Sequence, residues 1–381
     1  MKQPTAQSTR RRGGFQPPHC PRPTCAFHRR NPTWRFIRCG SYIDSRSAQR
    51  IQLYRCTHCG RAFSHRTFSC TYWLRYPHLL HPVATHVCEG AGLRQTARSL
   101  GTSHPTVARY VARLARHCLL FHRHLIEDHE IQEPLVVDGF ETYAYSQYFP
   151  FHINLAVGAG SWFIHDFTDS PLRRKGTMTQ AQRQRRELIE KRCGRPDPQA
   201  VEKGLWALLK SLLPRVSRQQ PFELHSDDHP AYRRALKRLR RDTPQCPKIR
   251  HRVTSSRKRR TMSNPLFPVN LTDLLLRHAS ANHRRETIAF SKLMQAALER
   301  AAVFTVWRNC IKQRSENGPR ETVAMWLGIT DRLLSWRQIL RRRLFPGHVA
   351  LPERWQAYYW RRVKSAVYGD RQAVHSAQYA F

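Results

Sequence analysis

Two carboxylates in this 381-residue chain stand where short apolar runs give way to polar residues. Asp138 follows Leu135–Val137 and precedes Gly139, and Asp227 follows Phe222–Ser226. Short apolar runs of this kind predict buried strands. Taken alone, an Asp and a glycine at a strand end are typical of a turn. Taken together, carboxylates at the ends of neighbouring strands suit Mg²⁺ or Mn²⁺, which prefer oxygen ligands.

A metal centre of this kind has a specific chemistry. Two divalent cations about 3.5–4 Å apart can activate an attacking hydroxyl and stabilise a leaving oxygen in phosphoryl transfer. The protein must then bring about three oxygen ligands together. If the strands that precede Asp138 and Asp227 are neighbours in a central sheet, they supply two of the ligands. A helix packed across the sheet would supply the third.

The elements that must position these ligands can be placed from the apolar pattern. From residue 133 to about 310 the order is β-β-β-α-β-α-β-α, which predicts an α/β domain. The polar, basic segment 171–200 interrupts this pattern and is expected to be an insertion or a mobile loop over the site. The predicted strands are 135–139, 151–157, 162–167, 222–226 and 249–254, and the predicted helices are 200–210, one that opens near 229, and 270–309 with a break near Asn282.

Residues 86–130 predict a helix-turn-helix domain. Gly101 ends the first helix, because glycine adopts the required left-handed conformation at little cost. Ser103 is the expected N-cap of the second helix. Arg109, Tyr110 and Arg113 are expected to face outward, where basic and aromatic side chains suit the major groove of DNA. An ordinary helical hairpin is the alternative.

Residues 19–70 hold six of the 11 cysteines. Two close pairs, Cys20 with Cys25 and Cys56 with Cys59, can close a tetrahedral zinc site, and strand-like sequence lies between the pairs. This pattern predicts a zinc ribbon in a reducing compartment. Free structural thiols are the alternative. Other residues nearby could replace one of the four ligands, namely His19, Cys39, His58 and Cys70.

The charge predicts the partner. Lys and Arg number 66 against 26 Asp and Glu, so the formal net charge is 66 − 26 = +40. Such an excess indicates a polyanion, of which nucleic acid is the first candidate. No apolar run reaches the roughly 20 residues of a membrane span, and residues 1–15 lack the apolar core of a secretory signal. We expect a cytoplasmic, nucleoid-associated protein with a basic disordered arm (1–18) and a basic helical tail (311–381).

Several stretches together resemble bacterial insertion-sequence transposases of the DDE class. They are Val137-Asp138-Gly139-Phe140, Ser226-Asp227-Asp228-His229-Pro230-Ala231-Tyr232 and Arg284-Arg285-Glu286-Thr287-Ile288-Ala289-Phe290-Ser291-Lys292. A zinc ribbon and a helix-turn-helix also precede the catalytic domain in several of those families. The resemblance covers residues 20 to about 310. It implies an RNase H-like domain at 133–310, with a mixed five-stranded sheet and flanking helices.

The resemblance also implies an activity and site residues. Asp138 and Asp227 match the first two catalytic carboxylates, which would hold Mg²⁺ or Mn²⁺ and act on double-stranded DNA, both element ends and target, in a homo-oligomer. The family places a Glu near Asn270, and this chain has none there. Glu286, Asn270 and Asp273 remain as candidates, ranked in that order. The alternatives are a catalytically dead DNA-binding regulator derived from a transposase and an RNase H-like nuclease.

Overall fold

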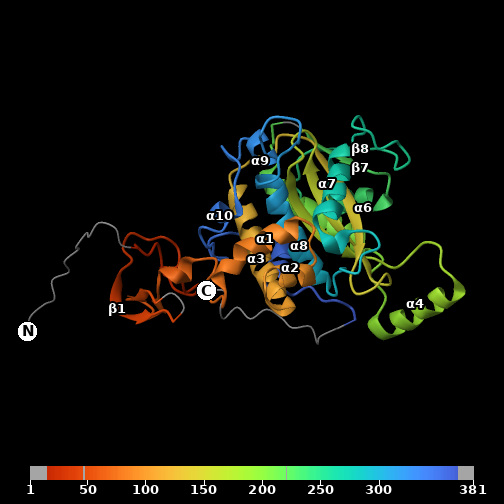
Figure 1. Cartoon of the computed structure of the whole chain (residues 1–381). Coiled ribbons are helices and arrows are strands. Elements are labelled where there is room, and N and C mark those ends of the chain that lie inside the picture. Colours follow the sequence, from red (N-terminus) through yellow and green to blue (C-terminus); the bar gives the residue numbers. More distant parts are fainter. Residues whose placement is uncertain (1–14, 46–47, 220, 368–381) are drawn as a thin grey trace, which may run out of the picture. The chain divides into compact units, whose positions relative to one another are not determined.

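The computed structural model describes residues 15–45, 48–219 and 221–367. The chain divides into two compact units, one ending at Leu74 and the other beginning at Arg75 (Figure 1). Most of the predicted arm, and the last part of the predicted tail, lie outside the described residues. The predicted helix-turn-helix and catalytic segments, and the described part of the predicted tail, belong to the second unit.

The first unit is a small antiparallel sheet with a cysteine-rich core. Its strands, in the order β1-β2-β3, are β1 (Phe36–Ile43), β2 (Arg50–Cys56) and β3 (Ala62–Phe63), and η1 (His65–Phe68) follows. Trp34, Tyr54 and Phe63 pack in the core beside buried cysteines. A core of this size rarely stabilises a fold alone, and small domains commonly add a structural metal or disulfides.

The second unit is built around a mixed five-stranded sheet in the order β6-β5-β4-β7-β8, so the predicted mixed α/β architecture is confirmed. β5 runs antiparallel to its two neighbours, β4 and β6, whereas β7 pairs in parallel with β4 and β8 pairs in parallel with β7. The strands are β4 (Leu135–Tyr143), β5 (Pro150–Gly158), β6 (Ile164–Pro171), β7 (Phe222–Ser226) and β8 (Ile249–Val253).

Helices cover the sheet because each places an apolar stripe against it. Val137 and Ala156 of the sheet share one buried core with α5 (Ala200–Leu212) and α6 (Pro230–Asp242). α7 (Phe267–Ala279) packs against β4 and β5. In contrast, α4 (Gln180–Cys193), all of which is described, buries none of its side chains. This helix lies in the segment predicted to be an insertion.

A second helical layer precedes the sheet in sequence. It contains η2 (Pro77–Leu79), α1 (Leu80–Cys88), α2 (Leu93–Ser99) and α3 (His104–Leu125). The predicted turn is confirmed, since Gly101 has a φ of +59° and the Ser103 side chain accepts the backbone N–H of Thr106. α3 packs along α8 (Met294–Cys310), a helix from the far end of the chain that is buried on nearly every side (Figure 1).

The tail is part of this same unit. Its helices are α9 (Val323–Trp326), α10 (Trp336–Ile339) and α11 (Glu353–Tyr359), and short 3₁₀ turns η3 (Leu213–Arg215) and η4 (Ala281–His283) occur earlier. Trp355 of α11 donates to the carbonyl of Phe167 at 2.9 Å, and Arg354 grips the Asp169 carboxylate with two hydrogen bonds of 2.6 Å. Among the described helices, none has both the length and the apolar character that a bilayer crossing requires.

Candidate functional site

The pairing of β4 with β7 brings the two predicted carboxylates together. The two strands pair in parallel at Leu135–Leu224 and Val136–His225, and the pairing ends there. Asp138 and Asp227 each lie two residues beyond the last pair, where the two strands separate. Side chains alternate between the two faces of a strand, so Asp138 is on the same face as Val136, and Asp227 continues the face of His225. The expectation that these two strands are neighbours is confirmed.

The local setting of Asp138 differs from the expectation. β4 runs on to Tyr143, so the prediction of a strand that ends at Gly139 is wrong. Position 139 has no room for a larger residue, because a Cβ atom there would lie 2.5 Å from Nδ1 of His152 on β5. The imidazole ring therefore packs directly against the backbone beside Asp138. β4 stays extended past Asp138 because its antiparallel pairing with β5 continues as far as Tyr143.

Three carboxylates interact electrostatically at this position. Burial raises the pKa of Asp138, and the neighbouring Asp227 adds to the rise. Burial also raises the pKa of Asp273 on α7 well above its usual range, and Asp138 adds to it. Oδ1 of Asp273 is buried and has no hydrogen-bond partner within the described part of the chain. Buried like charges with an open lone pair favour a bound cation.

Of the three candidates for a third ligand, the one that interacts electrostatically with Asp138 is Asp273, which sequence reasoning ranked last. Asp273 lies beside Asp138, and Asn270 is on the same face of α7 one turn earlier. Glu286, ranked first, lies in the segment between η4 and α8 and is exposed, with a φ of +52°. The expectation that Glu286 stands on a helix is wrong, because the chain breaks there into a turn.

A tyrosine and two arginines complete the surroundings. The Tyr232 hydroxyl lies 3.4 Å from Oδ1 of Asp138, and the backbone N–H of Gly139 donates to the same oxygen at 2.7 Å. Arg260 lowers the pKa of both Asp138 and Asp273, and Arg277 lowers that of Asp273. Sequence reasoning did not assign a role to Tyr232 or Arg277, and it considered Arg260 only as part of a basic run that would neutralise DNA. Tyr232 stands in a quoted motif, but the two arginines lie among many and carry no signal of their own.

The donor set fits a hard divalent cation. Three carboxylates and one amide supply only oxygen, the ligand type of Mg²⁺ and Mn²⁺. Among the described residues, the carboxylate oxygens of Asp138, Asp227 and Asp273 do not all approach within 4.8 Å of one another. Within the described residues, these three side chains therefore do not form a closed cage for a single ion.

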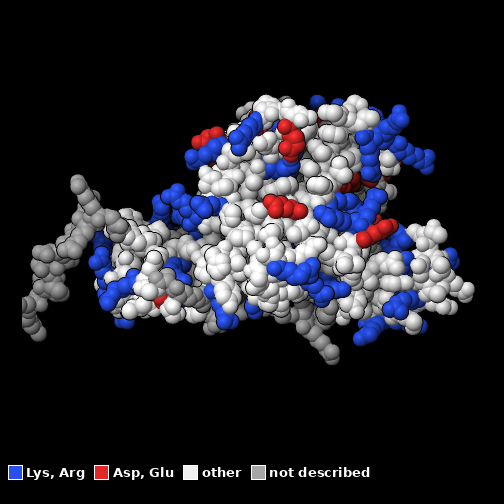
Figure 2. Space-filling view, in the orientation of Figure 1, with Lys and Arg blue, Asp and Glu red and all other residues white. Residues whose placement is uncertain are grey.

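A basic face adjoins the carboxylates. Between Arg233 and Arg260 only one acidic residue occurs, Asp242. Figure 2 shows Lys and Arg gathered where Figure 1 places β7 and β8. Arg260 lowers the pKa of Asp138 and of Asp273, so this basic face extends to the carboxylates. Its exposed members on α6, β8 and the segments beside them are Arg233, Arg234, Lys237, Arg240, Arg241, Lys248, Arg250, Arg252, Arg257, Lys258, Arg259 and Arg260.

The predicted DNA-reading residues of α3 have different surroundings. Arg109 is exposed and Arg113 is half-buried. Tyr110 is only 3% exposed, and its hydroxyl hydrogen-bonds the backbone of Tyr76. The prediction that Tyr110 faces outward is wrong, because the segment before α1 covers that side of α3. On α2, Arg94 and Arg98 are exposed.

In the first unit, the four predicted cysteines form a cluster. The Sγ atoms of Cys20, Cys25, Cys56 and Cys59 all lie within 4.8 Å of one another. The Cys20–Cys59 separation is 3.5 Å and the Cys25–Cys56 separation is 4.0 Å. Tetrahedral Zn–S bonds of about 2.3 Å place sulfur atoms about 3.8 Å apart. This cluster could therefore hold zinc.

Hydrogen bonds from backbone and indole N–H groups favour the thiolate form of Cys56, which is the form that binds a metal. Burial acts to raise the pKa of Cys56, but hydrogen bonds from Cys59, Trp34 and His58 outweigh it and lower the pKa to about 7. Trp34 Nε1 donates to Cys56 Sγ at 3.2 Å. Burial raises the pKa of Cys20 and of Cys25, so these two need a cation to become thiolates.

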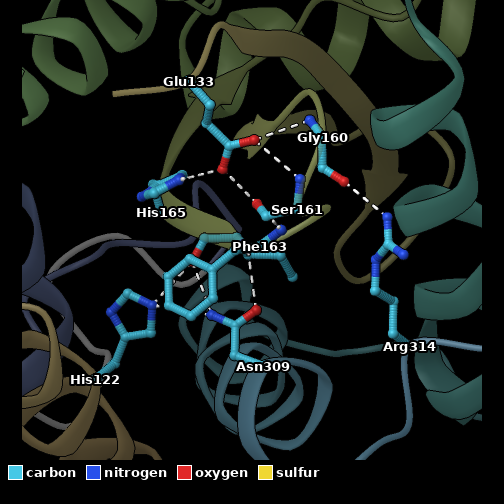
Figure 3. A network of polar contacts seen from close by, with 9 residues as sticks. His122, Glu133, Gly160, Ser161, Phe163, His165, Asn309 and Arg314 are labelled. Carbon is cyan, nitrogen blue, oxygen red and sulfur yellow. Dashed lines mark hydrogen bonds and ion pairs between the residues drawn. The ribbon is translucent and has the colours of Figure 1, made fainter. Parts of the chain in front are cut away.

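A second polar cluster contains Ser, Glu and His, and it is structural (Figure 3). Ser161 and the N–H of Gly160 donate to Glu133, whereas Nε2 of His165 lies 3.6 Å from Glu133 and does not contact the serine. Burial lowers the pKa of His165 to about 4, and Ser161 is fully buried. The arrangement therefore offers no activated nucleophile, and it fixes the β5–β6 turn.

Hydrogen bonds beside this cluster also join the helices α3 and α8 to the sheet. Ile164, the first residue of β6, donates its N–H to Asn309 of α8 at 3.0 Å. Its carbonyl accepts from Asn309 at 2.9 Å and from Nε2 of His122 on α3 at 2.9 Å. These hydrogen bonds tie α3 and α8 to the first residue of β6.

No protein-family model and no curated protein matches this sequence. The residues themselves support two features, a carboxylate centre beside a basic face and a tetrathiolate cluster in a separate unit. The first suits metal-dependent chemistry on a polyanion, and the second suits structural zinc.

Metal content tests the cysteine cluster. We expect the purified full-length chain to contain about one zinc ion, and Cys56→Ser to lose it, because a structural site needs all four thiolates. Atomic absorption after dialysis measures the ion. Cys39→Ser, a half-buried cysteine outside the cluster, is the matched control and should keep the metal. Retention of full zinc by Cys56→Ser would contradict the assignment.

The packing of His152 against Gly139 has its own test. Gly139→Ala should lower the free energy of unfolding by about 1–3 kcal/mol, because the added Cβ overpacks the site. Adding His152→Ala should restore part of that loss by removing the ring. Chemical denaturation of the single and double variants measures both changes. Equal losses in the two proteins would show that the ring does not oppose position 139.

Proposed function

We propose that this chain is a DDE-type DNA transposase that acts on the ends of a bacterial insertion sequence. Residues 133–310 would form its RNase H-like catalytic domain, residues 19–70 a zinc ribbon, and residues 86–130 a DNA-binding helix-turn-helix. The observation that carries the proposal is that Asp138 interacts electrostatically both with Asp227, which follows the paired strand β7, and with Asp273 of α7.

The charge distribution supports DNA as the substrate. The basic face defined above would neutralise phosphates and release counterions, which favours binding without reading the sequence. It extends to Arg260, which acts on Asp138 and Asp273. A DNA strand bound to this face would therefore reach the carboxylates. The exposed Arg94, Arg98 and Arg109 of the helix-turn-helix offer a separate surface for the element ends.

Asp138, Asp227 and Asp273 would hold Mg²⁺ or Mn²⁺, with Asn270 as an additional oxygen ligand. When bound, these ions would supply activation of a water or 3′-hydroxyl and charge neutralisation at the leaving oxygen. Tyr232 would hold the Asp138 carboxylate in place through its hydroxyl. Arg260 and Arg277 would limit the repulsion among the carboxylates until the metal and the DNA phosphate arrive.

Carboxylate variants test the proposal. Asp138→Asn, Asp227→Asn and Asp273→Asn should each reduce strand transfer by more than about 100-fold, because each removes a charged metal ligand. Binding of the same DNA should persist. The assay joins a duplex carrying the DNA that flanks the gene to a plasmid target in Mg²⁺ or Mn²⁺. Asp228→Asn, an exposed neighbour, is the matched control and should stay close to wild type.

The outcomes separate the alternatives. If Asp138→Asn leaves strand transfer unchanged, the enzyme proposal fails. If the wild-type chain binds the DNA without any reaction, a catalytically dead regulator explains it better. Cleavage without a joined product would identify an RNase H-like nuclease. A larger loss for Glu286→Gln than for Asp273→Asn would overturn the choice of third ligand.

A further inference from the structure

The segment between η4 and α8, residues 284–292, exposes an isoleucine almost completely. Ile288 is 99% exposed, more than any other large apolar side chain in the described residues. We call this segment the 284–292 loop. A single exposed apolar residue is common and needs no explanation by itself. The loop around Ile288, however, is held in shape, is strongly basic and lies near the end of β4.

Hydrogen bonds fix both ends of the loop. The N–H of Tyr145 donates to the carbonyl of Ser291 at 2.8 Å, and the Asn282 amide donates to Ser291 Oγ at 3.0 Å. At the other end, Arg284 donates to the carbonyl of His278 at 3.3 Å. Glu286 has a φ of +52°, a conformation that non-glycine residues rarely adopt. The loop therefore presents Ile288 on a preformed turn.

The charges around Ile288 select the partner. Arg284, Arg285 and Lys292 are all exposed, and Glu286 is the only acid in the loop. At this basic loop, a second copy of this chain, with its net charge of +40, would add like charge instead of neutralising it. A nucleic-acid duplex would be attracted, and its stacked bases offer the apolar contact that isoleucine lacks in water. Proteins that bend DNA insert such apolar side chains between base steps.

We propose that Ile288 is a DNA wedge, which inserts between two stacked base pairs while Arg284, Arg285 and Lys292 contact the flanking phosphates. This inference rests on the proposed function and adds a third DNA contact to it. Unstacking one base step would kink the duplex and so change the path of the strand that leads to the carboxylates.

The position of the loop predicts which base step is opened. The ring of Phe290 lies 5.6 Å from that of Tyr143, the last residue of β4. Tyr143 is five residues beyond Asp138 on that strand, which corresponds to about 17 Å at roughly 3.4 Å per residue. For a duplex that runs along β4, the same length spans about five base pairs at 3.4 Å each. We expect the unstacked step about four to six base pairs from the phosphate that reacts.

Fluorescence of 2-aminopurine tests the wedge without requiring catalysis. The full-length chain is mixed, without added Mg²⁺, with duplexes of the gene's flanking DNA that carry 2-aminopurine at successive positions. Unstacking should raise the fluorescence at one or two adjacent positions only. Ile288→Ala should abolish this rise while DNA is still bound. Leu188→Ala is the matched control, since Leu188 is 65% exposed on α4 and has Arg185 and Lys191 about one helical turn away on either side.

Each other result overturns the wedge. If Ile288→Ala keeps the rise, or if the wild type binds DNA without a rise at any position, Ile288 does not insert. If Ile288→Ala instead reduces the sedimentation coefficient of the free protein, the residue is a contact between copies of the chain. Failure of the wild type to bind DNA at all would remove the proposed function as well, so the two failures can be told apart.

Discussion

The candidate site depends on how far β4 and β7 stay paired. Two pairs, Leu135–Leu224 and Val136–His225, hold the strands together, and then the strands separate. If β4 and β7 stayed paired for longer, backbone hydrogen bonds would close the space between Asp138 and Asp227. If they were paired over fewer residues, the two carboxylates would not be held near each other. α7 brings Asp273 to the same place. The rest of the second unit fixes this junction, since α5 and α6 pack behind it and β5 keeps β4 extended beyond it.

The junction gathers negative charge, whereas the chain as a whole is strongly positive. A molecule with a net charge of +40 holds three half-buried carboxylates at this junction, where burial and a neighbouring carboxylate raise the pKa of Asp138 and of Asp273. Such an arrangement costs free energy unless a cation compensates. Arg260 and Arg277 compensate in part. The nearest comparison inside the second unit is Asp169, whose charge is fully matched by Arg354, so its role is structural.

The sequence predicted what depends on local pattern and missed what depends on three-dimensional packing. The five strands, the turn at Gly101 and the four clustered cysteines follow from apolar periodicity, a left-handed glycine and thiol spacing. Tyr110 was misjudged, because helical periodicity cannot reveal that the segment around Tyr76 covers it. Asp273 was ranked below Glu286 for a similar reason. Its position one turn after Asn270 gains meaning only when α7 is placed against β4.

The same packing gives α3 a part beyond the helix-turn-helix. Its first turns carry the exposed Arg109, whereas His122 near its end holds the first residue of β6 together with Asn309 of α8. A 22-residue helix is about 33 Å long, so α3 extends from one surface of the unit to the edge of the central sheet. Buried histidines at this junction are neutral, since burial lowers the pKa of His122 to about 3. The link from α3 to the sheet is therefore made of neutral hydrogen bonds, which salt weakens far less than it weakens the contacts of the basic face with phosphate.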